Sequence, residues 1–87
     1  MAGCATQIFS REFDAGLNAI PPQIRELILA KITDMGGRLD SFPHYRMTGR
    51  AEFRLRVGDY RIIYRFDVRR NEIELITLGH RREIYRE

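Results

Sequence analysis

The chain of 87 residues predicts an α+β fold, in which a two-helix hairpin packs on a small, mostly antiparallel sheet. Three observations lead to this prediction. Apolar residues recur with helical spacing in the first half of the chain, and they alternate with arginines in the second half. A Gly58-Asp59 turn joins the two clearest strands. The expected order is β-α-α-β-β-β, and residues 1–87 should form a single domain with one core.

The first half of the chain predicts a short strand and two helices. Residues 5–9 are a possible strand, and Ser10 follows as the N-cap of a first helix that breaks at residues 18–21. The proline pair at 21–22 opens a second helix, which the glycine pair at 36–37 ends. One face of this second helix should be apolar and should cover the sheet. It carries Ile24, Leu27, Ile28, Ile32 and Met35.

Three strands are expected in the second half of the chain. Residues 38–51 come first, as a long irregular connection, and a loop of this length in a compact domain is often functional. The strands should then cover residues 52–57, 60–67 and 72–78. Gly79 is expected to end the sheet.

The first two of these strands form a hairpin whose two-residue turn fixes the register. Val57 should lie opposite Tyr60, and Arg56 opposite Arg61. Residues that lie directly opposite each other point to the same side of a sheet. One side should therefore join the core, through Phe53, Leu55, Val57, Tyr60, Ile62, Tyr64 and Phe66. The other side should carry Arg54, Arg56, Arg61 and Arg65, together with Ile63 and Glu52.

Four arginines on one small face indicate a site for an anionic ligand, because like charges opposed across a strand pair are destabilising. The alternative is an ordinary solvated face, since arginines also protect sheet edges and keep proteins soluble. The charge is uneven along the chain: residues 1–41 carry a net charge of −1, and residues 42–87 carry +4. Fourteen of the 15 basic residues are arginine, whose planar guanidinium suits contacts with phosphate.

Several classes of function are made improbable by what the sequence lacks. It has no Gly-rich phosphate loop and no Cys/His spacing for a metal, so we expect neither a metal nor another cofactor. We expect His44, in the long connection, to have no catalytic role. Cys4 is the one cysteine, which fits a reducing, cytoplasmic location. No apolar run approaches the roughly 18 residues of a membrane span.

Residues 79–86 should leave the last strand close to the arginines and could close over them. This segment carries His80, Arg81, Arg82, Tyr85 and Arg86. Its cations could bind successive phosphates and stabilise the extra negative charge of a pentacovalent phosphorane, while a tyrosine can stack on a base. The set is sufficient to bind RNA. Cleavage would also need a proton acceptor for the 2′-hydroxyl and a proton donor for the leaving 5′-oxygen.

Two motifs occur together in this half of the chain. The run Phe-Arg-Leu-Arg-Val-Gly-Asp-Tyr-Arg-Ile-Ile-Tyr occupies residues 53–64, and Gly-His-Arg-Arg-Glu-Ile-Tyr occupies residues 79–85. Met-Thr-Gly-Arg precedes them at residues 47–50. In this combination the chain resembles the RelE branch of the RelE/ParE toxin superfamily. The resemblance covers most of the chain and implies a RelE-like fold.

The resemblance implies the toxin of a type II toxin–antitoxin system. Such a toxin is a ribosome-dependent endoribonuclease that cuts mRNA in the ribosomal A site and so inhibits translation. Its partners would be the ribosome, the mRNA and a cognate antitoxin encoded beside it, with which it forms a hetero-oligomer. Two other readings stay open: a ParE-like inhibitor of DNA gyrase without nuclease activity, and a degenerate RNA-binding member of the family.

The family's functional residues can be carried over to matching positions. Arg54 and Arg56 match basic residues of the second strand, Arg61 and Arg81 would hold the phosphate, and Tyr85 would stack on or orient the scissile nucleotide. The expected further contacts with RNA are Arg50, Arg65, Arg82 and Arg86.

One departure from the family concerns the general base. The best-known member has lysines where this chain has Arg54 and Arg56, and one of those lysines is proposed to act as a base. Arginine stays charged and cannot easily accept a proton. His80 is the expected replacement because an imidazole titrates near neutral pH. The alternative for His80 is a solvent-exposed turn histidine.

Overall fold

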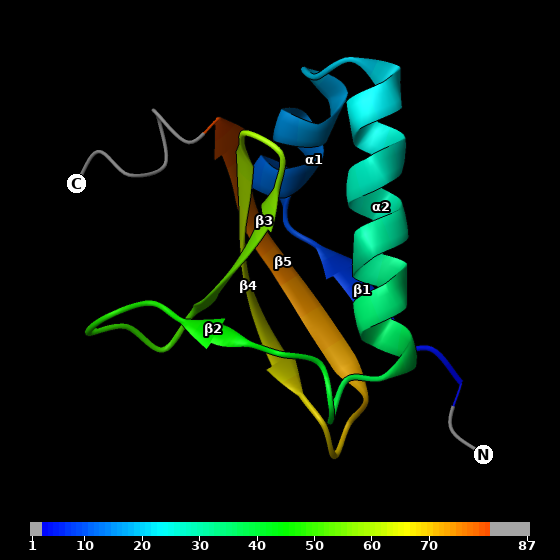
Figure 1. Cartoon of the computed structure of the whole chain (residues 1–87), viewed down its shortest axis with the longest axis vertical. Coiled ribbons are helices and arrows are strands. Elements are labelled where there is room, and N and C mark those ends of the chain that lie inside the picture. The colour runs from blue at the N-terminus through cyan, green and yellow to red at the C-terminus, as the bar shows by residue number, and fades with distance from the viewer. Residues whose placement is uncertain (1–2, 81–87) are drawn as a thin grey trace.

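The computed structural model describes residues 3–80 and has two helices packed against one face of a five-stranded sheet (Figure 1). The elements in chain order are β1 (Thr6–Phe9), α1 (Arg11–Asn18), α2 (Pro22–Gly37), β2 (Tyr45–Arg46), β3 (Phe53–Val57), β4 (Tyr60–Asp67) and β5 (Glu72–His80). The spatial order of the strands is β1-β5-β4-β3-β2. β1 is parallel to β5, and the other neighbours are antiparallel. The predicted α+β class is confirmed.

The N-cap of the first helix, α1, also ties the helix to β5. The Ser10 hydroxyl accepts a hydrogen bond from the Phe13 N–H (3.0 Å) and donates one to the carbonyl of Ile76 in β5 (2.5 Å). Gly16 lies so close to β5 that an added Cβ would stand 2.9 Å from the carbonyl oxygen of Leu78. The absence of a side chain at this position therefore lets α1 approach the sheet.

The second helix, α2, buries most but not all of the predicted apolar face. Ile28, Ile32 and Met35 are fully buried, and Ile24 is half-buried. Leu27 was expected beside them, and this was wrong: it is 59% exposed. It stands one residue before Ile28, about 100° around the helix, which takes it off the buried stripe.

The sheet differs from the predicted one mainly by an added strand and by the end of β5, while β1 and β3 each start one residue later than expected. Residues 45–46, expected in an irregular loop, form β2 and pair with the start of β3. A strand of two residues has no alternation that a sequence pattern can reveal. Gly79 does not end the sheet, because β5 continues to His80, where Gly79 pairs with Arg61 and His80 with Tyr60.

The β3–β4 hairpin has the predicted register, with Val57 opposite Tyr60 and Arg56 opposite Arg61. Gly58 has a φ of +60°, the left-handed value that the first position of a two-residue type II′ turn requires. The helix-facing side is the core that the alternation predicts. Its buried residues are Leu55, Ile62 and Tyr64, and its partly buried ones are Phe53, Val57, Tyr60 and Phe66.

His44 anchors the segment that leads from α2 to β2. Its Nε2 lies 2.8 Å from the carbonyl oxygen of Leu39, and its Nδ1 lies 2.6 Å from the Tyr64 hydroxyl. A carbonyl can only accept, so Nε2 donates to Leu39, and the Tyr64 hydroxyl pairs with Nδ1. Burial raises the pKa of Tyr64, which keeps that hydroxyl protonated. The ring also stacks on Phe66, with centroids 3.8 Å apart, so the role of His44 is structural.

The close approach of α1 and β5 yields a stability prediction. Gly16→Ala should lower the free energy of unfolding by about 1–3 kcal/mol, because the new methyl group would overlap backbone atoms that cannot easily move. The control is Gly37→Ala in α2, whose added Cβ would have only the Cys4 sulfur within reach, at 3.9 Å. Urea unfolding of both variants would test this. Equal midpoints for Gly16→Ala and the parent protein would contradict the packing described here.

Candidate functional site

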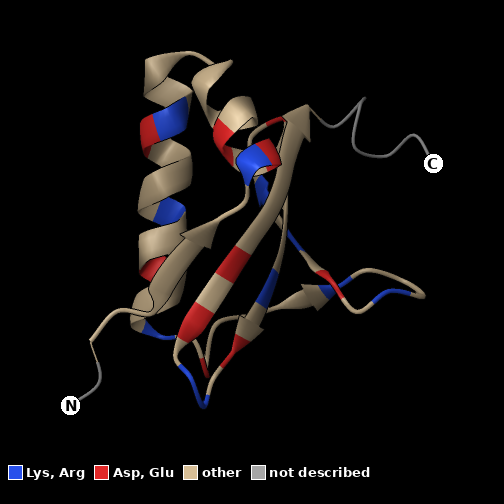
Figure 2. Ribbon diagram, turned by 180° about the vertical axis from the view of Figure 1, so that it is seen from behind, with Lys and Arg blue, Asp and Glu red and all other residues tan. Residues whose placement is uncertain are grey.

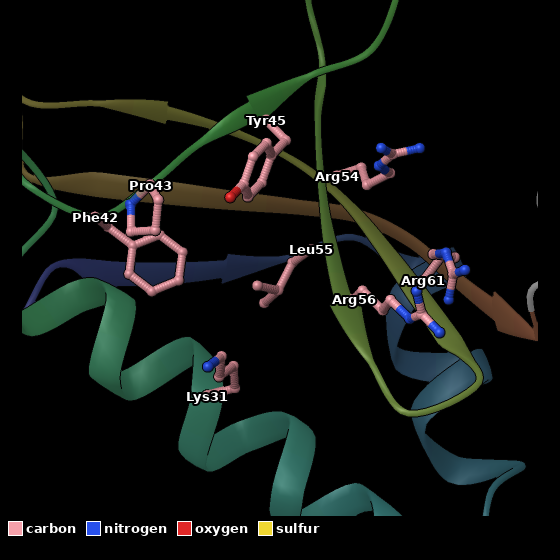
Figure 3. A pocket seen from close by; sticks show the side chains of 8 residues that line it. All are labelled: Lys31, Phe42, Pro43, Tyr45, Arg54, Leu55, Arg56 and Arg61. Atoms are coloured by element: carbon pink, nitrogen blue, oxygen red, sulfur yellow. The ribbon is translucent and has the colours of Figure 1, made fainter.

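Three of the four predicted arginines line one cavity, at the open edge of β3 (Figure 3). Its volume is about 530 Å³, within the usual range for a ligand site. Its walls come from α2, from the segment that leads to β2, and from the β3–β4 hairpin. The lining residues are Lys31, Phe42, Pro43, Tyr45, Arg54, Leu55, Arg56 and Arg61.

The hairpin positions the three arginines because alternate residues of a strand share a face. Arg54 and Arg56 are exposed on β3, whereas Arg61, directly opposite Arg56 on β4, is only 6% exposed. Arg56 donates to the carbonyl of Gly58 (3.3 Å), and Arg61 donates to that of Tyr60 (3.4 Å). These bonds orient two like charges toward the same space. An anion bound between them would relieve their repulsion.

Arg65 shares this face of the sheet but lies at its other end. It forms ion pairs with Glu52 (2.8 Å) and with Glu74 on β5 (3.8 Å), and Glu52 also lies 3.6 Å from Arg50. The hydrogen bond from Arg65 holds the pKa of the Glu52 carboxyl below its ordinary value. Figure 2 shows the acidic residues of β5 in its first half. The structure therefore does not bring Arg50 and Arg65 into the arginine cavity.

His80 was expected near the arginines, and the extended β5 places it elsewhere. It pairs with Tyr60, and the two rings stand edge to face with centroids 5.6 Å apart. Tyr60 belongs to the helix-facing side of the sheet, so His80 lies on that side too. Gly79 is the residue that lies opposite Arg61. His80 is thus not among the residues that line the arginine cavity.

The remaining predicted site residues lie outside the described residues. These are Arg81, Arg82, Tyr85 and Arg86. Within residues 3–80, no group of three or more His, Cys, Asp or Glu side chains is arranged to hold a metal ion. Neither helix in this part of the chain is long and apolar enough to cross a membrane.

Several cavity residues were not identified from the sequence. Tyr45 reaches the cavity because β2 pairs with β3, and Lys31 reaches it because α2 packs beside that strand. Phe42 and Pro43 come from the connection that was treated as irregular. The one available signal was an aromatic residue and a proline in a long loop directly before the arginine-rich hairpin.

Comparison with known proteins gives the family. A model described as the ParE toxin of the type II toxin–antitoxin system parDE matches residues 8–85, which is most of the chain. The chain belongs to the RelE/ParE toxin family. It is therefore a toxin of a toxin–antitoxin system, as the sequence motifs indicated. No curated protein sequence matches the chain.

Solved structures of RelE toxins are similar to this toxin. The RelBE2 toxin–antitoxin complex of Mycobacterium tuberculosis gives a TM-score of 0.72 at 22% identity, covering 92% of this chain and 94% of that chain. The RelB–RelE complex of Methanococcus jannaschii gives a TM-score of 0.71 at 26% sequence identity, covering 90% of this chain and 94% of that chain. A mutant of E. coli RelE in the free state gives a TM-score of 0.75 at 13% sequence identity, covering 94% of this chain and 90% of that chain. The fold of this toxin is thus that of RelE.

The division of the sheet face yields a prediction for Glu52. Its carboxyl should titrate below the ordinary range, and Arg65→Ala should raise its pKa because the main stabilising hydrogen bond is lost. A lowered pKa in the folded state means that this interaction stabilises the fold at neutral pH. The contribution is then lost as the pH falls through the folded-state pKa.

An NMR titration of the Glu52 carboxyl carbon would measure this directly. Arg69→Ala is the matched control, since Arg69 is an exposed turn residue that contributes nothing to the Glu52 pKa. An unchanged Glu52 titration in Arg65→Ala would contradict the ion pair and would leave Arg65 available for RNA.

Proposed function

We propose that this toxin is a ribosome-dependent endoribonuclease of the RelE type, which inhibits translation by cutting mRNA in the ribosomal A site. The observation that carries the proposal is the convergence of Arg54, Arg56 and Arg61 on one cavity at the side of a rigid hairpin. Guanidinium groups bind phosphate in two-point geometry, and a strand scaffold holds them in place. The RelE-like fold and the motif at residues 79–85 support the same function.

The proposed reaction is a transesterification within the RNA. The 2′-oxygen forms a bond to the adjacent phosphorus, and the bond from phosphorus to the 5′-oxygen breaks after a pentacovalent, negatively charged phosphorane. Arg61 is suited to stabilise that charge because it is almost fully buried, where an electrostatic interaction is stronger than in water. By resemblance, Arg81 shares this role, and Tyr85 stacks on the scissile nucleotide.

Arginine also limits the mechanism. Arg54 and Arg56 remain charged at physiological pH, so we assign them to binding and charge stabilisation and not to proton transfer. His80 does not line the cavity, so we do not assign it as the base. The 2′-hydroxyl proton then passes to water, and water supplies a proton to the 5′-oxygen. Electrostatic stabilisation is usually the largest single contribution to such catalysis, which is consistent with a site made of fixed cations.

A second candidate function is inhibition of DNA gyrase without nuclease activity. It is favoured by one observation: the family model that matches residues 8–85 is that of the ParE toxin. The two functions differ in a direct assay. Primer extension on mRNA in a purified translation system would reveal cuts within A-site codons for the nuclease. Intact mRNA together with inhibited DNA supercoiling would identify the gyrase inhibitor.

We further propose a cognate antitoxin as the partner of this cytoplasmic toxin, within a hetero-oligomer. Several of the structurally similar proteins are complexes of a RelE toxin with its RelB antitoxin. Three arginines around one cavity favour a partner that carries an acidic segment. Such a segment, disordered when free, can cover a large surface and fold as it binds.

The arginines provide the test of nuclease activity. Arg61→Ala and Arg81→Ala should each lower the rate of mRNA cleavage by at least about a hundredfold, because loss of one transition-state donor costs about 2.7–4 kcal/mol. Arg69→Ala, in the exposed turn before β5, should cleave at the parent rate. Cleavage would be followed by primer extension in a purified translation system.

Because Arg61 is buried, its alanine variant must be shown to be folded, by circular dichroism and thermal melting. Arg61→Lys serves as a second variant that keeps the charge but loses the planar two-point contact, so it should also cleave more slowly. Parent rates in folded Arg61 and Arg81 variants would refute the assignment of these residues.

The partner is tested by coexpression with the neighbouring open reading frame, followed by pull-down of the tagged toxin. An acidic chain should copurify, and its association should become slower as salt is raised, because salt screens the attraction to the arginines. A toxin that purifies alone, is harmless to cells and binds no adjacent gene product would contradict the proposed partner.

A further inference from the structure

The cavity extends beyond the three arginines, along the unpaired part of β3. β2 is two residues long, so its pairing with β3 stops at Arg54. The chain on the other side of Tyr45 turns away toward α2, where His44 is tied to the carbonyl of Leu39. The gap that results is lined by Phe42, Pro43 and Leu55, with Lys31 of α2 on the wall across from β3 (Figure 3).

Tyr45 is the most exposed large aromatic residue of this wall. It is 63% exposed, it lies directly opposite Arg54, and its ring lines the cavity (Figure 3). The neighbouring Arg46, by contrast, packs on the sheet: its guanidinium lies over the Phe53 ring, 5.3 Å from the centroid. Tyr45 contributes nothing comparable to the core and instead presents an apolar ring face beside cations.

We propose that Tyr45 and Lys31 form a nucleotide subsite for single-stranded RNA next to the arginine cluster, with a base stacked on Tyr45 and an adjacent phosphate bound by Lys31. The proposal deepens the nuclease function and rests on it for the identity of the substrate. It gives the RNA a path: phosphates at Arg54, Arg56 and Arg61, and the next base along the edge of β3. Single-stranded nucleic acids are commonly bound in this way, by a cationic groove that carries stacking platforms.

The aromatic and apolar part of the cavity, beside Tyr45, favours RNA over an acidic peptide. A carboxylate side chain would engage the cations but would leave the ring of Tyr45 and the apolar lining of Phe42, Pro43 and Leu55 without a matching group. A nucleotide matches both, because a flat base and a charged phosphate are covalently joined. The anchoring of His44 also holds Tyr45 in place, which lowers the entropy cost of stacking.

Binding can be measured apart from catalysis. The probe is a fluorescein-labelled RNA hexamer with every 2′-hydroxyl methylated, which cannot undergo the cleavage reaction, and the readout is fluorescence anisotropy. Tyr45→Ala should weaken binding about tenfold, since stacking on an aromatic ring is commonly worth that much per base. Tyr45→Phe should bind like the parent protein, because stacking needs the ring and not the hydroxyl.

Two further variants complete the set. Lys31→Ala should weaken binding and reduce the slope of log K against log salt by about one, as expected for the loss of one phosphate contact. Leu27→Ala is the matched control on α2, an exposed apolar residue that does not line the cavity, and it should bind like the parent protein.

The outcomes separate this subsite from the nuclease function. If the parent protein fails to cleave mRNA but hexamer binding depends on Tyr45, the subsite is supported and the nuclease function falls. If the parent protein cleaves mRNA and Tyr45→Ala binds the hexamer normally, the subsite alone is refuted. Labelled hexaglutamate provides the rival probe. Tighter and Tyr45-dependent binding of hexaglutamate than of RNA would overturn the proposal in favour of an acidic protein segment.

Discussion

The two-residue turn between β3 and β4 determines both the core and the arginine cavity. Because the loop has only two residues, it fixes how β3 pairs with β4. A shift of this pairing by one residue would turn every side chain of β3 to the other side of the sheet. Burial of Leu55, Ile62 and Tyr64 opposes such a shift, at about 1.5–3 kcal/mol for each fully buried large side chain. Repulsion between the opposed Arg56 and Arg61 is smaller, at most about 1 kcal/mol. The core therefore holds the like charges together.

Features that depend on neighbouring residues could be predicted from the sequence, and features that depend on distant ones mostly could not. The Ser10 cap and the hairpin register follow from local rules, and both are found. The place of Tyr45 could not be predicted because a two-residue strand has no period, and only its pairing with β3 brings it to the cavity. The ion pair between Arg65 and Glu52 could be predicted from the sequence, since the hairpin register places the two positions opposite each other.

The charges on the open face of the sheet are unevenly distributed, and this distribution should place a bound anion at one end of the face. At one end, Glu52 and Glu74 balance Arg65, and at the other end three arginines surround a cavity. A polyanion crossing this face meets attraction at one end and carboxylates at the other. The wall that faces the hairpin is held by His44, whose two ring nitrogens are both hydrogen-bonded. The cavity is thus bounded on one side by a hydrogen-bonded hairpin and on the other by a segment that His44 ties to Leu39 and Tyr64.

The parallel pairing of β1 with β5 has a consequence for how the molecule is made. Among the described strands, β1 pairs with β5 alone, and the Ser10 cap reaches Ile76 across 66 residues of chain. Synthesis delivers β1 before β5, so the N-terminal strand has no strand partner until β5 has been translated. Contacts this distant in sequence form late in folding. A newly made molecule therefore cannot complete its sheet until β5 has left the ribosome.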